Sequence, residues 1–207
     1  MILLYLFSIC VCDEIKYAHG CVWLKIFYHD STGGVFFTSY TEGESTNQPQ
    51  KFSILKTIDD RFKYNNKFEF LLEYPEVSGY NRWRQSLNPL YDNEVANQKA
   101  TGYEPISISW TGEYWGGLVR TTLSSASFPC LIDGSAGNER WWYAIGLISP
   151  QFSPNIPGPS YATSSNSILL KKVKLWVRID NTKIPYPSHP NPKSFRLLIS
   201  ILFFTLL

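Results

Sequence analysis

Three runs of residues alternate in side-chain character, and this period of two restricts the fold more than any other feature of the sequence. They are Val22–Tyr28, Phe68–Tyr74 and Val173–Ile179. Alternation of this kind is typical of strands that bury one face. Shorter strand candidates lie at Ile106–Trp110 and Trp141–Ile145. Short strands separated by turn-forming residues predict a mainly β, sandwich-like domain.

The same alternation assigns faces to the predicted strands. In the first strand one side holds Val22, Leu24, Ile26 and Tyr28, and the other holds Trp23, Lys25 and Phe27. The last strand has a basic side that also carries an indole, formed by Lys172, Lys174, Trp176 and Arg178. In the middle strand Glu69 and Glu73 share one side, which we expect to face water because acidic residues rarely lie in a core.

Residues 52–63 change the period from two to that of a helix. Ile54, Leu55, Ile58 and Phe62 would share one helical face, with charged residues around the rest. We therefore expect the single amphipathic helix of the domain near residues 52–63. Residues 41–50 are polar and predict a surface loop. Residues 35–38 predict a short strand that forms a hairpin with 22–28.

The N-terminal run Ile2–Cys12 is apolar and uncharged. Its length suits the apolar core of a signal peptide better than a membrane span. We expect residues 1–12 to be removed, with cleavage before Asp13, and a cut near Ala18 or Gly20 is a second interpretation. A buried N-terminal strand is the alternative to a signal peptide. Residues 13–180 would then form the single folded domain.

The C-terminal region combines a Pro-rich spacer, 181–194, with an apolar tail, 195–207. Such an order resembles a signal for a GPI anchor, with Asn181 or Ser188 as the attachment residue. Arg196 interrupts the start of the tail, so an unprocessed tail stays open as the alternative. Contact with a membrane is expected only through this lipid anchor.

Removal of residues 1–12 would leave two cysteines, Cys21 and Cys130. An even pair in an oxidising compartment predicts a disulfide, and two buried thiols are the alternative. The chain has no Asn-x-Ser/Thr sequence, so N-glycosylation is not expected.

The composition and motifs argue against two classes of function. The net charge is +2 and basic residues are interspersed with acidic ones, which does not suit nucleic-acid binding. No nucleophile elbow, metal-binding spacing or phosphate-binding loop is present in a fitting context. His29, Asp30 and Ser31 are adjacent, but neighbours in a strand point to opposite faces and cannot converge on a substrate. We therefore expect no catalytic residues and no enzymatic activity.

Aromatic residues make up 16% of the chain, and several lie beside polar groups that could bind sugar hydroxyls. The candidate ligand-binding residues are Trp83, Arg84, Asn88, Trp115, Asp133, Asn138 and Trp141. Trp83 and Trp115 are the first choices because Gly and Pro mark their surroundings as loops. Each tryptophan has a core position as its alternative. A calcium site formed by Asp133, Asn138 and Glu139 is a weaker hypothesis, and we expect no cofactor.

Several segments from residue 22 to 180 resemble an extracellular module that recurs in secreted and surface proteins of cnidarians, including skeletal organic matrix-like proteins, and of protists. The segments that carry this resemblance include Trp23–Gly34, Phe68–Pro75, Tyr80–Trp83, Gly102–Ile106, Trp115–Leu118, Ile132–Ser135, Trp141–Gly146, Ile156–Pro159 and Val173–Ile179. The resemblance implies an extracellular matrix or adhesion setting and supplies no catalytic residues. The sequence thus predicts a secreted or cell-surface module that binds a glycan or a matrix protein, with a purely structural role as the alternative.

Overall fold

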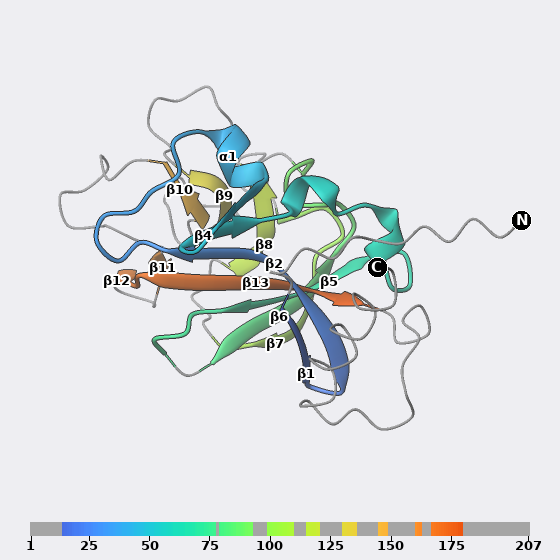
Figure 1. Cartoon of the computed structure of the whole chain (residues 1–207). Coiled ribbons are helices and arrows are strands. Elements are labelled where there is room, and N and C mark those ends of the chain that lie inside the picture. Colours follow the sequence, from blue (N-terminus) through green and yellow to red (C-terminus); the bar gives the residue numbers. More distant parts are fainter. Residues whose placement is uncertain are drawn as a thin grey trace, which may run out of the picture.

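The computed structural model describes residues 14–77, 79–92, 99–109, 115–120, 130–135, 145–148, 160–162 and 167–179. Strands dominate this part of the chain, and one short α-helix accompanies them (Figure 1). The elements are β1 (Ile15–Ala18), β2 (Cys21–Asp30), α1 (Tyr40–Glu44), β3 (Thr46–Gln48), β4 (Lys51–Ser53), the 3₁₀ turns η1 (Leu55–Thr57) and η2 (Asp60–Phe62), β5 (Phe68–Glu73), β6 (Tyr80–Gln85), β7 (Glu104–Ile108), β8 (Trp115–Arg120), β9 (Cys130–Ser135), β10 (Ile145–Leu147), β11 (Ser160–Ala162), β12 (Ser167–Leu169) and β13 (Lys172–Ile179). The mainly β prediction with a single helix is confirmed.

The strands form one large antiparallel sheet and two small ones. The large sheet has the order β3-β4-β2-β13-β5-β6-β7, and β1 also pairs with β2. The second sheet has the order β10-β9-β8, and β11 pairs with β12. The two strands at the centre of the large sheet, β2 and β13, come from opposite ends of the described chain. No helix in the described ranges is long and apolar enough to cross a membrane.

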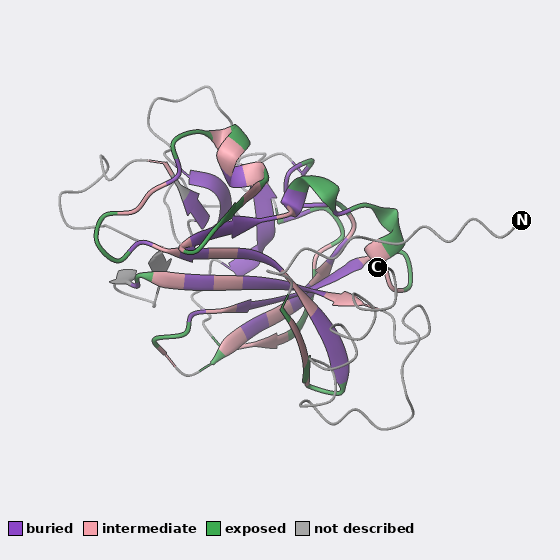
Figure 2. Ribbon diagram, in the orientation of Figure 1, coloured by how far each residue is buried: buried purple, intermediate pink, exposed green. Residues whose placement is uncertain are grey.

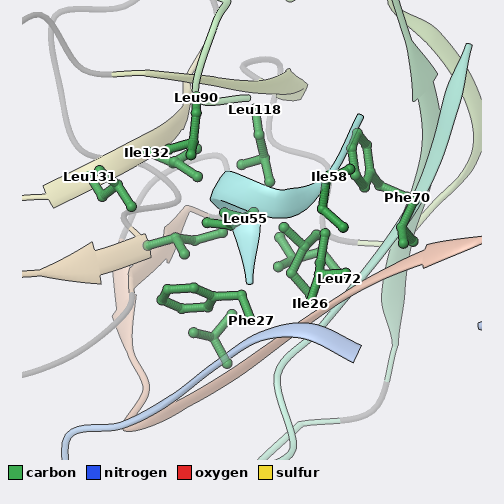
Figure 3. Close-up of a cluster of buried hydrophobic side chains, with 14 of the residues drawn as sticks. Ile26, Phe27, Leu55, Ile58, Phe70, Leu72, Leu90, Leu118, Leu131 and Ile132 are labelled. Carbon is green, nitrogen blue, oxygen red and sulfur yellow. The ribbon is translucent and has the colours of Figure 1, made fainter. Parts of the chain in front are cut away.

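The main core lies between one face of the large sheet and the three-stranded sheet (Figure 3). Ile26 and Phe27 of β2 and Phe70 of β5 contribute from the large sheet, while Leu118 and Ile132 contribute from β8 and β9. This two-layer arrangement matches the sandwich-like prediction. We call this face of the large sheet the inner face and the opposite face the outer face. Figure 2 shows the resulting alternation of buried and partly exposed residues along β13.

A bulge in β2 changes the predicted faces of the first strand. Leu175 of β13 pairs with Phe27, but the next residue, Trp176, pairs with Lys25, so Ile26 is an extra residue in β2. Ile26 and Phe27 are therefore both in the main core, whereas the alternation predicted opposite sides. The same shift moves Tyr28 to the outer side. The prediction was wrong because a bulge interrupts the period.

The helix predicted at residues 52–63 is not formed. Residues 51–53 are strand β4, which pairs with β2, and two 3₁₀ turns follow. Leu55 and Ile58 are still buried in the main core, so the apolar pattern identified core residues but not their conformation. The cause is tertiary: the side-chain amide of Asn88 donates to the carbonyls of Leu55 and Ile58, each at 2.9 Å, and Asp59 caps η2. Side chains thus form hydrogen bonds with backbone groups that would bond to one another in a helix.

The only α-helix in the described residues, α1, instead overlaps the start of the predicted loop 41–50. Ser39 caps α1 by accepting a hydrogen bond from the backbone of Glu42. Gly43 faces Leu131 of β9, where an added Cβ would lie 3.1 Å from the leucine side chain. The helix thus packs closely on the three-stranded sheet because of one glycine. Residues 35–38 form no strand, and β2 pairs with β1, β4 and β13 instead.

Candidate functional site

The two tryptophans predicted to stack on sugars belong to the core. Trp83 of β6 has no exposed surface, and its indole N–H donates to Gln85 Oε1 at 2.9 Å. Trp115 of β8 is 6% exposed, and its ring meets that of Trp83 edge to face at 4.8 Å. Neither ring has a face open to a ligand, which contradicts the predicted stacking. Gly- and Pro-rich surroundings did not mark exposed loops here, because both residues lie on strands that face the core.

Asn88 and Asp133 are buried as well. Asn88 is 4% exposed and uses its amide to hold the η1 segment, so its hydrogen bonds are structural. Asp133 on β9 is 1% exposed, which does not suit a ligand at the surface. Asn138, Glu139 and Trp141 lie outside the described residues. Within the part of the chain that the structure describes, no three His, Cys, Asp or Glu side chains are grouped so as to hold a metal ion.

Cys21 and Cys130 are both buried, and the structure contains no disulfide between them. Cys21 lies on the outer side of the large sheet with Trp23, Leu71 and Trp176. Cys130 lies on β9, in the layer that covers the inner face. The two cysteines belong to different layers of the fold, so the structure does not support the predicted pairing.

The outer face of the large sheet is partly covered by the hairpin of β1 and the first half of β2 (Figure 1). The ring of His19, at the hairpin turn, lies 4.1 Å from that of Tyr80 on β6. Beneath the hairpin a small second core joins Trp23, Leu71 and Trp176. Trp176 is 1% exposed, so the indole on the basic side of the last strand is buried.

At one end of the part of the outer face that the hairpin covers, Glu73 of β5 lies at the centre of several polar contacts. Its carboxylate accepts a hydrogen bond from the Trp176 indole at 2.7 Å and pairs with Lys16 of β1 at 2.5 Å. The Lys16 ammonium also lies 4.2 Å above the Trp176 ring. Burial lowers the pKa of Lys16, and the hydrogen bond with Glu73 opposes that shift. These contacts join the hairpin to the sheet and fix the Glu73 side chain.

A half-open hollow of about 340 Å³ lies beside Glu73, and we call it the Tyr80 hollow. Its lining consists of Glu73, Tyr74, Pro75, Val77, Gly79, Tyr80 and Lys174. Glu73 and Lys174 are neighbours in register on β5 and β13, and their side chains are 29% and 27% exposed. The hollow therefore joins an aromatic ring to one carboxylate and one ammonium that a ligand can reach.

At the other end of the covered part of the outer face, Glu69 lies fully buried among three arginines. We call Glu69, Arg82, Arg84 and Arg178 the Glu69 cluster. Arg82 donates to Oε1 through Nε at 2.8 Å and through Nη2 at 2.5 Å. Oε2 accepts from Arg84 Nε at 3.2 Å and from Arg178 Nη1 at 2.9 Å. Burial raises the pKa of Glu69, but the hydrogen bonds and charges of Arg82 and Arg178 outweigh burial and lower it overall.

The Glu69 cluster contains Arg84, the one predicted site residue in the described part of the chain that is not buried. Glu69 itself was expected to face water, and this expectation was wrong because arginines from β6 and β13 cover it. A signal was present in the sequence: acidic residues on one side of 68–74 match basic residues on one side of 80–85 and of 172–179. That complementarity predicts neighbouring strands.

Comparison with known proteins identifies no relative of this chain: no family model, no curated protein and no solved structure matches it significantly.

Proposed function

We propose that this chain is an extracellular binding module and that the Tyr80 hollow binds a carbohydrate. The observation that carries this proposal is the combination, in one concave site, of the Tyr80 ring with the side chains of Glu73 and Lys174. Sugar sites in proteins pair an aromatic face, which packs on the C–H side of a pyranose ring, with charged or polar groups that bind hydroxyls. A volume of about 340 Å³ suits one or two sugar rings.

The contacts around the hollow support binding rather than proton transfer. Glu73 is held by the Trp176 indole and the Lys16 ammonium, so its carboxylate stays a fixed acceptor. Lys174 also contacts Glu14 at 3.4 Å, an exposed pairing that a ligand could displace at little cost. Because these polar groups are already fixed, the protein loses less side-chain entropy when a ligand binds.

The extracellular setting is part of the proposal and rests on the sequence. The apolar run before Asp13 and the resemblance to secreted cnidarian and protist modules both favour it. The second candidate function is a structural or adhesive role through protein contacts. Strand β7 favours it, because it ends the large sheet and its residues Glu104, Pro105 and Ile106 are exposed. A strand that ends the sheet among the described residues can add a strand from another protein, although Pro105 limits the pairing.

The test is a glycan-array screen with the full chain, followed by titration of each hit with Tyr80→Ala and with a matched control, Tyr91→Ala. Tyr91 is 60% exposed and does not line the hollow. We expect Tyr80→Ala to weaken binding at least tenfold while Tyr91→Ala binds like the wild type. Equal binding by both variants would refute the site. Absence of binding to every glycan would refute sugar recognition and favour the adhesive role.

A further inference from the structure

We propose that the Glu69 cluster is a second binding site, for the sulfate group of a sulfated polysaccharide. This inference uses residues other than those of the Tyr80 hollow. It therefore does not depend on the proposed function of that hollow.

The Glu69 cluster carries excess positive charge. One carboxylate faces three guanidinium groups, so the cluster carries a net charge of +2. A buried carboxylate can be neutralised by one well-placed arginine, and the bifurcated contact of Arg82 with Oε1 already provides this. The charges of Arg84 and Arg178 exceed what Glu69 needs. Neighbouring guanidiniums repel one another, and an added anion would relieve that repulsion.

Arg84 and Arg178 each use only part of their hydrogen-bond donors on Glu69. Arg84 contacts Glu69 only through Nε, and Arg178 only through Nη1. Within the described part of the chain, the remaining N–H groups of these two arginines donate to no protein acceptor. Their side chains are 29% and 19% exposed, so an anion can approach from solvent. The planar fork of N–H groups on arginine matches two oxygens of a sulfate group.

Neighbouring residues already hold these arginines in place. The Arg178 guanidinium lies 3.7 Å from the centre of the Tyr64 ring, which fixes its plane. Arg84 is opposite Glu69 in the register of β5 and β6. The other acid near Arg84 is Glu104, which is opposite it on β7 and forms an ion pair with Lys67. Because Glu104 already pairs with Lys67, it does not neutralise the net positive charge of the Glu69 cluster.

The experiment compares the same substitution at two arginines, one inside the Glu69 cluster and one outside it. Arg84→Gln removes a charge from the cluster. Arg120→Gln removes a charge from β8, where Arg120 pairs with Glu44 at 2.9 Å and is 24% exposed. Binding of the full chain to heparin, to the unsulfated carboxylated polymer hyaluronan and to inorganic phosphate is measured by calorimetry at constant ionic strength. Tyr80→Ala is included to separate this site from the Tyr80 hollow.

We expect heparin to bind, Arg84→Gln to weaken it about tenfold or more, and Arg120→Gln and Tyr80→Ala to change it less than twofold. Equal losses in the two arginine variants would show nonspecific attraction and overturn the site. Tighter binding of hyaluronan or phosphate than of heparin would overturn the assignment to sulfate. If Arg84→Gln does not fold, Arg84→Lys against Arg120→Lys applies the same criterion, because lysine keeps the charge but lacks the planar fork.

Discussion

Replacement of Glu69 by glutamine tests directly how much the buried carboxylate and its arginine partners stabilise the fold. The side chain of Glu69 is 0% exposed, whereas its three arginine partners are 16%, 29% and 19% exposed. Glutamine keeps the shape but removes the charge and turns an N–H₂ group toward guanidinium donors. Removal of one partner of a buried ion pair costs about 3 to 5 kcal/mol. Because the arginines can recover some hydration, we expect about 3 kcal/mol of lost stability at pH 7.

The assay is urea unfolding of wild type and Glu69→Gln from pH 7 down to pH 3. The folded-state pKa of Glu69 lies below its ordinary value of 4.5, so the charged form is favoured by folding. Its contribution is fully present above pH 4.5 and is lost as the pH falls through the folded-state pKa. The difference between wild type and variant should therefore shrink below pH 4.5.

The control is Glu104→Gln on the neighbouring edge strand. Glu104 also pairs with a cation, but its side chain is 52% exposed, so we expect little change at any pH. A Glu69→Gln variant as stable as Glu104→Gln, or a difference that does not depend on pH, would refute the reasoning.

Three further predictions concern other buried side chains. Asn88→Ala should lose about 2 kcal/mol in urea unfolding, because two buried carbonyls lose their donor; an unchanged midpoint would contradict this. Burial lowers the pKa of His29 from 6.5, so the unfolded chain binds its proton first, and stability should decrease as the pH falls below 6.5. His29→Phe should flatten that decrease, and an equally steep slope in the variant would argue against it. Non-reducing peptide mapping after denaturing alkylation should find Cys21 and Cys130 as separate alkylated thiols, whereas a linked pair of peptides would show a disulfide.

The sequence predicted the strands whose alternation is regular and the class of fold. Alternation in 68–74 and 173–179 identified β5 and β13 because each buries one face against the main core. It failed at Ile26, where a bulge that depends on β13 inserts a residue. It also failed at 52–63, since the groups that replace helical hydrogen bonds come from Asn88, far along the chain.

The candidate sites were harder to predict than the strands. Tryptophan was the residue type chosen for sugar contact, but Trp83 is fully buried, and the hollow is lined instead by the half-buried Tyr80. Arg84, one of the candidate ligand-binding residues, is partly exposed and contacts Glu69, which was expected to face water. Whether a polar strand face is open depends on what folds over it, and here the hairpin of β1 and β2 does so. Local periodicity carries no information about such a cover.

The pairing of β2 with β13 has a consequence for how the chain folds during synthesis. Asp30 pairs with Lys172 and Val22 pairs with Ile179, so the centre of the large sheet joins segments that are made early and late. Contacts between distant segments slow folding and leave strand edges open in the meantime. A chain that ends before residue 172 keeps β2 and β5 with unpaired edges in what should be the middle of the sheet. Such a truncated chain should aggregate through those edges, while arrival of the last strand closes both at once.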